Sequence, residues 1–158
     1  MPLSLTIEIT SPHQMKALGH SLGRVFFPGC VVGLVGQLGA GKTFLTRAIA
    51  EGLDIPNSRM VSSPTFVLVQ EYPARLPIYH FDAYRLNSED EFYDLGAHEY
   101  FEGEGVCLVE WADKVEKCLP SERLAIHITN TGETSRSVEI TGHGDRYELL
   151  LGKIDTPK

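Results

Sequence analysis

The chain has 158 residues, of which 42% are hydrophobic, and its formal net charge at pH 7 is -7. This length and apolar content suit one domain with a single core, which we expect over residues 1–158. The negative charge argues against independent binding to nucleic acid, which requires a basic surface. No apolar run approaches the ~20 residues of a membrane-spanning helix, and the first residues lack the pattern of a signal peptide.

The cysteines Cys30, Cys107 and Cys118 are odd in number and share no metal-ligand spacing. Cys30 and Cys107 lie inside apolar runs, so we expect buried free thiols. Free thiols are typical of a reducing compartment, and we therefore expect a soluble cytoplasmic protein that makes no contact with a membrane.

The first third of the chain alternates strands and helices. A strand is predicted over 5–10, followed by a helix with Ser11 as its N-cap and Pro12 at its first position. The apolar run 30–35 is typical of a strand buried in the middle of a parallel sheet. A second helix is predicted from 42 to about 52.

The rest of the chain is richer in hairpins. The predicted elements are strands over 66–72 and 78–82, a helix from Ser88 to about Gly96, a buried strand over 106–110, a helix over 112–118, and strands over 123–130, 135–141 and 146–151. The last of these could equally be a short helix. This order predicts an α/β fold, a three-layer sandwich with helices on both faces of a mixed parallel and antiparallel sheet.

Residues 36–43 read GQLGAGKT and fit the P-loop pattern G-x-x-x-x-G-K-[ST], between a predicted buried strand and a predicted helix. Glycines let the backbone curl so that successive N–H groups converge on phosphate oxygens, and the helix N-terminus adds unsatisfied donors. The fold is therefore expected to be that of a P-loop NTPase. The expected nucleotide-binding residues are Gly36, Gln37, Leu38, Gly39, Ala40, Gly41, Lys42 and Thr43.

Two of these residues have further expected roles. The Lys42 ammonium is expected to reach the β- and γ-phosphates, which makes it catalytic as well as binding. The Thr43 hydroxyl is expected to bind Mg²⁺.

Magnesium in such a site needs a carboxylate at the end of a neighbouring buried strand. The run VCLVE ends in Glu110, which we expect to be the second metal ligand. The run IYHFD ends in Asp82, which could be another ligand or the group that positions the attacking water. Arg85 could neutralise charge or pair with a carboxylate. His80 lies on the same side of its strand as Asp82. A lone histidine in a strand is more often packed or hydrogen-bonded than catalytic.

The loop 61–66 lies where many P-loop proteins have a segment that senses the nucleotide. Thr65, Ser62 and Ser63 offer hydroxyls toward magnesium or the γ-phosphate, although a serine-rich turn before a strand explains them equally well. The guanine-recognition pattern [NT]-K-x-D has only a near miss at 152–155, so ATP is the expected nucleotide.

The blocks GQLGAGKT, SSPTF, HFDAYRL and CLVEWADK occur in this order along the chain. In their residues and spacing they resemble the TsaE (YjeE) family of bacterial ATPases. The resemblance implies a subunit that hydrolyses ATP during threonylcarbamoyl modification of the adenosine next to the tRNA anticodon. It implies TsaD and TsaB as partners, with tRNA contacted only indirectly. It also implies phosphate and magnesium binding by Lys42 and Thr43, a metal-ligand role for Glu110, and a requirement for Asp82 in activity.

The adenine pocket is harder to predict. A right-handed crossover makes strand 5–10 parallel to strand 30–35, which places Ser11 at the nucleotide edge. If strand 123–129 is also parallel, Glu133 in the following loop joins that edge. Both are candidates for base or ribose contacts, although Ser11 is already explained as an N-cap.

The segment 88–105 interleaves acidic and aromatic residues. It is a candidate docking surface, although such a charge run is more often a solvated face. We expect an energy-coupling, Mg²⁺-dependent ATPase subunit that is weak alone and is activated by partner proteins. Two alternatives remain. One is a switch in which ATP binding controls assembly and hydrolysis is incidental, and the other is a small-molecule kinase.

Overall fold

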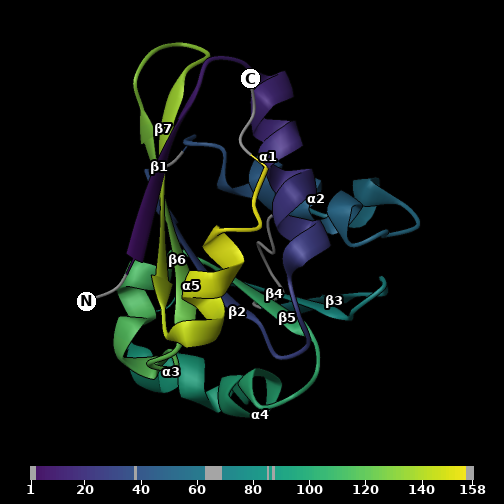
Figure 1. Ribbon diagram of the computed structural model, residues 1–158. Helices are drawn as coiled ribbons and strands as arrows, with labels where there is room; N and C mark the ends of the chain where they lie inside the picture. The colour runs from purple at the N-terminus through teal and green to yellow at the C-terminus, as the bar shows by residue number, and fades with distance from the viewer. Residues whose placement is uncertain (1–2, 38, 63–68, 85, 87, 156–158) are drawn as a thin grey trace.

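The computed structural model describes residues 3–37, 39–62, 69–84, 86 and 88–155. Its centre is a sheet in which the described strands follow the order β1-β7-β6-β2-β5-β4-β3 (Figure 1). The strands are β1 (Leu3–Ile9), β2 (Val31–Gly36), β3 (Val69–Tyr72), β4 (Ile78–Asp82), β5 (Val106–Glu110), β6 (Arg123–Asn130) and β7 (Arg136–His143). The structure thus confirms the predicted α/β fold with a mixed sheet.

Strand directions place several carboxyl ends at one edge of the sheet. β2 pairs in parallel with β5 and β6, and β4 pairs in parallel with β5. β7 is antiparallel to both β6 and β1, so β1 runs in the same direction as β2, as predicted, with β6 and β7 between them. The ends of β1, β2, β4, β5 and β6 therefore meet at the edge where α/β proteins bind ligands.

Helices cover the two faces of the sheet. The helices are α1 (Pro12–Val25), α2 (Lys42–Gly52), η1 (Ser58–Met60), α3 (Glu89–Asp94), α4 (Ala97–Phe101), η2 (Ala112–Cys118) and α5 (Asp145–Leu151). One hydrophobic cluster joins α1, α2 and α5 to the sheet, and a second joins α3, α4 and η2 to the other face. The predicted three-layer arrangement is therefore confirmed.

The segment 146–151, predicted as a strand or a short helix, is helical in α5. Tyr147, Leu150 and Leu151 are buried, whereas Leu149 is 69% exposed. This spacing of buried residues fits a helix rather than the alternation of a strand. The helices η1 and α4 were not predicted, and 112–118 forms a 3-10 helix.

Glycines allow α1 and α2 to lie side by side (Figure 1). A Cβ atom on Gly19 would lie 2.3 Å from the Cβ of Ala48, and one on Gly23 would lie 2.3 Å from the carbonyl oxygen of Ile49. A Cβ on Gly52 would lie 2.5 Å from the carbonyl oxygen of His20. The close contact fixes the position of α2, whose first residues carry the P-loop lysine and threonine.

The helix caps and cysteines follow the predictions made from sequence. Ser11 is the N-cap of α1 and its hydroxyl accepts a hydrogen bond from the backbone N–H of Gln14, 3.2 Å away. Cys30, Cys107 and Cys118 are buried free thiols. Among the described residues, every helix is too short or too polar to cross a membrane.

Candidate functional site

The P-loop connects the end of β2 to the start of α2. Gly39 and Gly41 have φ angles of +81° and +103°, in the left-handed region that other residues rarely adopt. Gly41 is the N-cap of α2, and the backbone N–H of Ala40 bonds the carbonyl oxygen of Gln37 at 3.0 Å. Leu38 lies outside the described residues. The predicted strand, glycine loop and helix are therefore all present, with the helix beginning at Lys42.

Lys42 folds back over the loop that precedes it. Its Nζ atom donates hydrogen bonds to the carbonyl oxygens of Gly36, at 2.5 Å, and Gln37, at 3.0 Å. It also lies 3.9 Å from the centroid of the Trp111 ring. Burial lowers the pKa of Lys42, and the nearby carboxylates, Glu110 above all, oppose that shift. The ammonium group is thus held in the loop, among negative charges and beneath an aromatic ring.

Glu110 ends β5 and is only 2% exposed. The Thr43 hydroxyl donates to its carboxylate, with distances of 3.2 Å to Oε1 and 3.4 Å to Oε2. Both groups are hard oxygen ligands of the kind that Mg²⁺ prefers, and adjacent ligands of an octahedral Mg²⁺ lie roughly 3 Å apart. The pair therefore fits the expected metal site. No group of three or more His, Cys, Asp or Glu metal ligands occurs in the described part of the chain. Mg²⁺ bound with a nucleotide does not need such a group, because phosphates and water supply its other ligands.

Asp82 lies beside Glu110. It ends β4, the parallel neighbour of β5, and the two residues are paired in the register of the sheet. Its Oδ1 atom accepts a hydrogen bond from the backbone N–H of Tyr84 at 2.9 Å. Paired positions on neighbouring strands face the same side, so the two carboxylates belong to one site. The structure brings Asp82, Lys42, Thr43 and Glu110 together.

His80 is buried and hydrogen-bonded, as its position in the sequence indicated. Its Nε2 atom contacts Glu110 Oε2, and its Nδ1 atom lies 3.1 Å from the Tyr72 hydroxyl. Sequence reasoning placed His80 on the same side of β4 as Asp82 and did not link it to Glu110.

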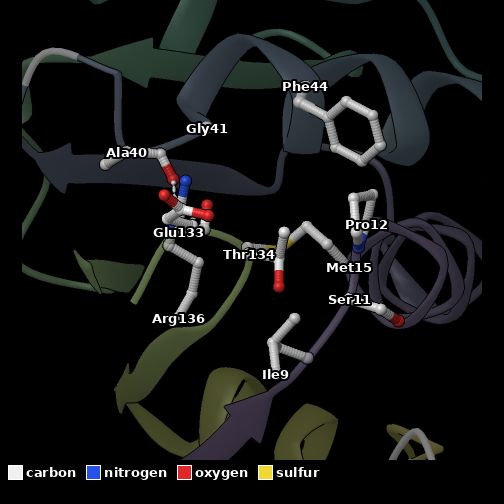
Figure 2. A pocket seen from close by; sticks show the side chains of 10 residues that line it. All are labelled: Ile9, Ser11, Pro12, Met15, Ala40, Gly41, Phe44, Glu133, Thr134 and Arg136. Atoms are coloured by element: carbon white, nitrogen blue, oxygen red, sulfur yellow. Dashed lines mark hydrogen bonds between the residues drawn. The ribbon is translucent and has the colours of Figure 1, made fainter. Parts of the chain in front are cut away.

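A cavity of about 230 Å³ adjoins the P-loop (Figure 2). Its walls are mostly apolar and consist of Ile9, Ser11, Pro12, Met15, Ala40, Gly41, Phe44, Glu133, Thr134 and Arg136. Ser11 and Glu133, predicted from strand direction alone, therefore both line a cavity beside the loop. The Ser11 hydroxyl turns toward the first turn of α1, in keeping with its bond to Gln14 (Figure 2).

Arg136 is a residue of this cavity that sequence reasoning missed. Its Nε atom donates to the carbonyl oxygen of Ala40 at 3.1 Å (Figure 2). Its Nη1 atom donates to the carbonyl oxygens of Gly132 and Ser135, at 3.1 and 2.8 Å. Arg136 thereby joins the P-loop to the 131–135 loop. Arg136 and Ala40 are far apart in the chain and no local motif surrounds the arginine, so this contact could not be predicted from sequence.

Thr65, Ser63 and Arg85 lie outside the described residues, whereas Ser62 is described and exposed.

In the segment 88–105, Phe92 and Phe101 are buried against Phe81 in the second cluster. These two rings are therefore not available to a partner, and the predicted docking surface is wrong at Phe92 and Phe101. Tyr93 is 51% exposed and remains part of that surface.

A family model described as "Threonylcarbamoyl adenosine biosynthesis protein TsaE" matches residues 9–138. The chain belongs to the TsaE family. This family acts in tRNA threonylcarbamoyladenosine biosynthesis.

Individual members of the TsaE family cover most of the chain. The tRNA threonylcarbamoyladenosine biosynthesis protein TsaE of Bacillus subtilis (strain 168) is 49% identical over 145 residues, which is 91% of this chain and 89% of the relative. The protein of the same name from Treponema pallidum (strain Nichols) is 39% identical over 122 residues, which is 77% of this chain and 89% of the relative. The crystal structure of Bacillus subtilis YdiB matches with a TM-score of 0.82 at 40% identity, covering 97% of this chain and 95% of that one.

Proposed function

We propose that the chain binds ATP with Mg²⁺ at its P-loop and hydrolyses it to support threonylcarbamoyladenosine formation on tRNA. The observation that carries the proposal is the meeting of Lys42, Thr43 and Glu110 at the start of α2. A phosphate-binding loop, an ammonium group and a hydroxyl–carboxylate pair are the parts that phosphoryl transfer from a nucleotide requires. Membership of the TsaE family supports the assignment of the biological reaction.

Each group has a proposed role. The backbone N–H groups of the loop bind the phosphates, and the Lys42 ammonium, now bonded to two loop carbonyls, turns to the β- and γ-phosphates. Thr43 and Glu110 would hold Mg²⁺, which when bound neutralises charge on the phosphates. Asp82 orients the attacking water, since it lies beside Glu110 at the end of β4.

The nucleoside is proposed to occupy the cavity shown in Figure 2. Apolar side chains such as Met15 and Phe44 offer surfaces for a purine ring. Glu133 offers an acceptor for the ribose or the exocyclic amine, and Arg136 holds the loop that carries Glu133 against the P-loop.

TsaD and TsaB are the proposed partners, and tRNA is proposed to contact them rather than this acidic chain. The alternative is a switch, in which ATP binding alone assembles the complex. A reconstituted modification reaction separates the two proposals. We expect threonylcarbamoyladenosine to form over repeated cycles with ATP and wild-type protein, and to fall by ~10²-fold or more with Lys42→Ala.

A non-hydrolysable ATP analogue completes the test. Full product over repeated cycles with the analogue would favour the switch and contradict a need for hydrolysis. Full product with Lys42→Ala and ATP would contradict the role of the P-loop altogether.

A further inference from the structure

His80 lies beneath the proposed magnesium site, and the proposed function gives it no role. Its side chain is 0% exposed and is enclosed between strands β3 and β5. One ring nitrogen contacts the carboxylate of Glu110, and the other contacts the hydroxyl of Tyr72. A fully buried imidazole that uses both nitrogens is held in one orientation.

The sheet explains why these groups meet. His80 pairs with Leu108 on β5 and with Gln70 on β3. Glu110 follows Leu108 by two residues and Tyr72 follows Gln70 by two, so all these side chains share the face of the sheet that α2 covers. The contacts therefore follow from strand register.

The chemistry of the contact between His80 and Glu110 indicates which atom donates the hydrogen bond. As a metal ligand Glu110 would be ionised, and an ionised carboxylate only accepts hydrogen bonds, so in the proposed site Nε2 would donate to Glu110 Oε2. Thr43 lies nearer to the other oxygen, with 3.2 Å to Oε1 against 3.4 Å to Oε2. His80 therefore contacts one oxygen of the carboxylate, and the Thr43 hydroxyl lies within hydrogen-bond distance of both oxygens.

The opposite side of the imidazole is also held. The Tyr72 hydroxyl lies 3.1 Å from Nδ1, contacts Gln70 Oε1 and lies 3.5 Å from the carbonyl oxygen of Ser62. The imidazole and phenol rings are 5.9 Å apart between centroids. A chain of contacts thus runs from β3 through the imidazole to the carboxylate.

We propose that His80 is a positioning residue that holds the Glu110 carboxylate in the orientation needed to bind Mg²⁺ together with Thr43. This inference rests on the proposed function, because it requires Glu110 to be a metal ligand. Groups that hydrogen-bond a metal ligand from outside orient it, and their loss typically costs 10–100-fold in metal affinity.

The test uses two amide substitutions of His80. In His80→Gln the side-chain amide nitrogen can take the place of Nε2 and still donate to Glu110, whereas in His80→Asn it reaches only the place of Nδ1. The measurement is the Mg²⁺ concentration that gives half-maximal binding of a fluorescent ATP analogue, together with the affinity for the analogue in EDTA. For His80→Asn we expect the Mg²⁺ requirement to rise 10–100-fold with unchanged affinity in EDTA. For His80→Gln we expect a rise of less than about 3-fold, because the donor is retained.

A matched control is available in the same chain. His20 Nε2 lies 2.9 Å from Glu51 Oε1, at the opposite end of α2 from Lys42. His20→Asn removes a histidine–glutamate contact of the same kind and should leave the Mg²⁺ requirement unchanged. If His80→Asn does not fold, Tyr72→Phe removes the contact to Nδ1 and should raise the requirement by about 2–5-fold, since it loosens the imidazole without removing it.

Three results would overturn the inference. The first is an unchanged Mg²⁺ requirement in His80→Asn (or in Tyr72→Phe, where that variant replaces it), and the second is an equal rise of the requirement in His80→Asn and His80→Gln. The third is a parallel loss of affinity for the analogue in EDTA, which would indicate a structural role alone. Glu110→Gln, measured beside them, separates this failure from that of the proposed function. If the Mg²⁺ requirement rises in Glu110→Gln but is unchanged in His80→Asn, only the role of His80 is refuted. An unchanged requirement in Glu110→Gln refutes the metal site itself, and the inference with it.

Discussion

The ammonium group of Lys42 lies 3.9 Å from the centroid of the Trp111 ring. Trp111 directly follows the proposed metal ligand Glu110 and has a φ angle of +59°, which is unusual for a residue with a large side chain. This left-handed backbone directs the indole over the P-loop, where it also packs against Tyr84 at 4.9 Å between centroids. The structure thus places Trp111 at the candidate site, beside the P-loop lysine.

This contact predicts an optical signal for nucleotide binding. Trp111 is the single tryptophan of the chain, so its fluorescence reports this one place. When Lys42 turns from the loop carbonyls to the phosphates, the charge beside the indole changes. We expect a saturable change in tryptophan fluorescence on addition of ATP with Mg²⁺, and none in Lys42→Ala. A fluorescence change of equal size in Lys42→Ala would show that the lysine does not cause it.

Asp82 is predicted to act on hydrolysis more than on binding. It lies at the end of β4, beside Glu110, whereas the phosphates are expected at the loop before α2. Asp82→Asn should therefore keep the affinity for ATP within a few-fold and lower turnover by ~10²-fold or more, which is typical for loss of a catalytic base or a water-positioning group. Calorimetric binding and a steady-state ATPase assay on one preparation check both values. A parallel collapse of binding and turnover would make Asp82 a binding or structural residue.

The contact between α1 and α2 predicts a large effect of one methyl group. In Gly23→Ala the new Cβ atom would lie 2.3 Å from the Ile49 carbonyl oxygen and 2.8 Å from the Gly52 backbone. Both contacts are with backbone, so the helices must separate, and we expect a loss of about 1–3 kcal/mol in the free energy of unfolding. Gly152→Ala is the matched control, because its Cβ would meet only the Leu149 carbonyl oxygen, at 3.5 Å. Urea unfolding of both variants measures the difference, and equal stabilities would contradict the close packing of the helices.

The buried cysteines predict a loss of stability at high pH. Burial raises the pKa of the Cys30 and Cys107 thiols from 9.0 to about 12. The folded state therefore favours the protonated thiols, and their contribution to stability is complete below pH 9 and is lost as the pH rises toward 12. We expect the free energy of unfolding to fall over this range in the wild type, and to fall less steeply in Cys30→Ala. Identical slopes in the two proteins would show that the Cys30 thiol does not titrate differently on unfolding.

Much of the site was predictable because its residues belong to local patterns. The P-loop from Gly36 to Thr43 and the acids Asp82 and Glu110 at strand ends are visible in short stretches of sequence. Strand direction placed Ser11 and Glu133 at the correct edge, since the carboxyl ends of parallel strands meet there.

The missed features depend on contacts between distant segments. The bond of Arg136 to Ala40 and that of His80 to Glu110 arise only when strands are placed in order, and no local spacing encodes strand order. Phe92 and Phe101 looked available for a partner because their sequence does not show that α3 and α4 cover the second face of the sheet.

We propose that TsaD and TsaB activate ATP hydrolysis by this chain, and the most direct test is the rate of ATP hydrolysis with and without these two proteins. A P-loop enzyme that receives a missing catalytic group from a partner can gain roughly 10³–10⁵-fold in turnover. We predict slow hydrolysis by the isolated chain and a rate in the mixture far above the sum of the separate proteins, abolished by Lys42→Ala. Activation by partners would be contradicted if the rate in the mixture equalled that sum. It would also be contradicted if the isolated chain already hydrolysed ATP as fast as the mixture.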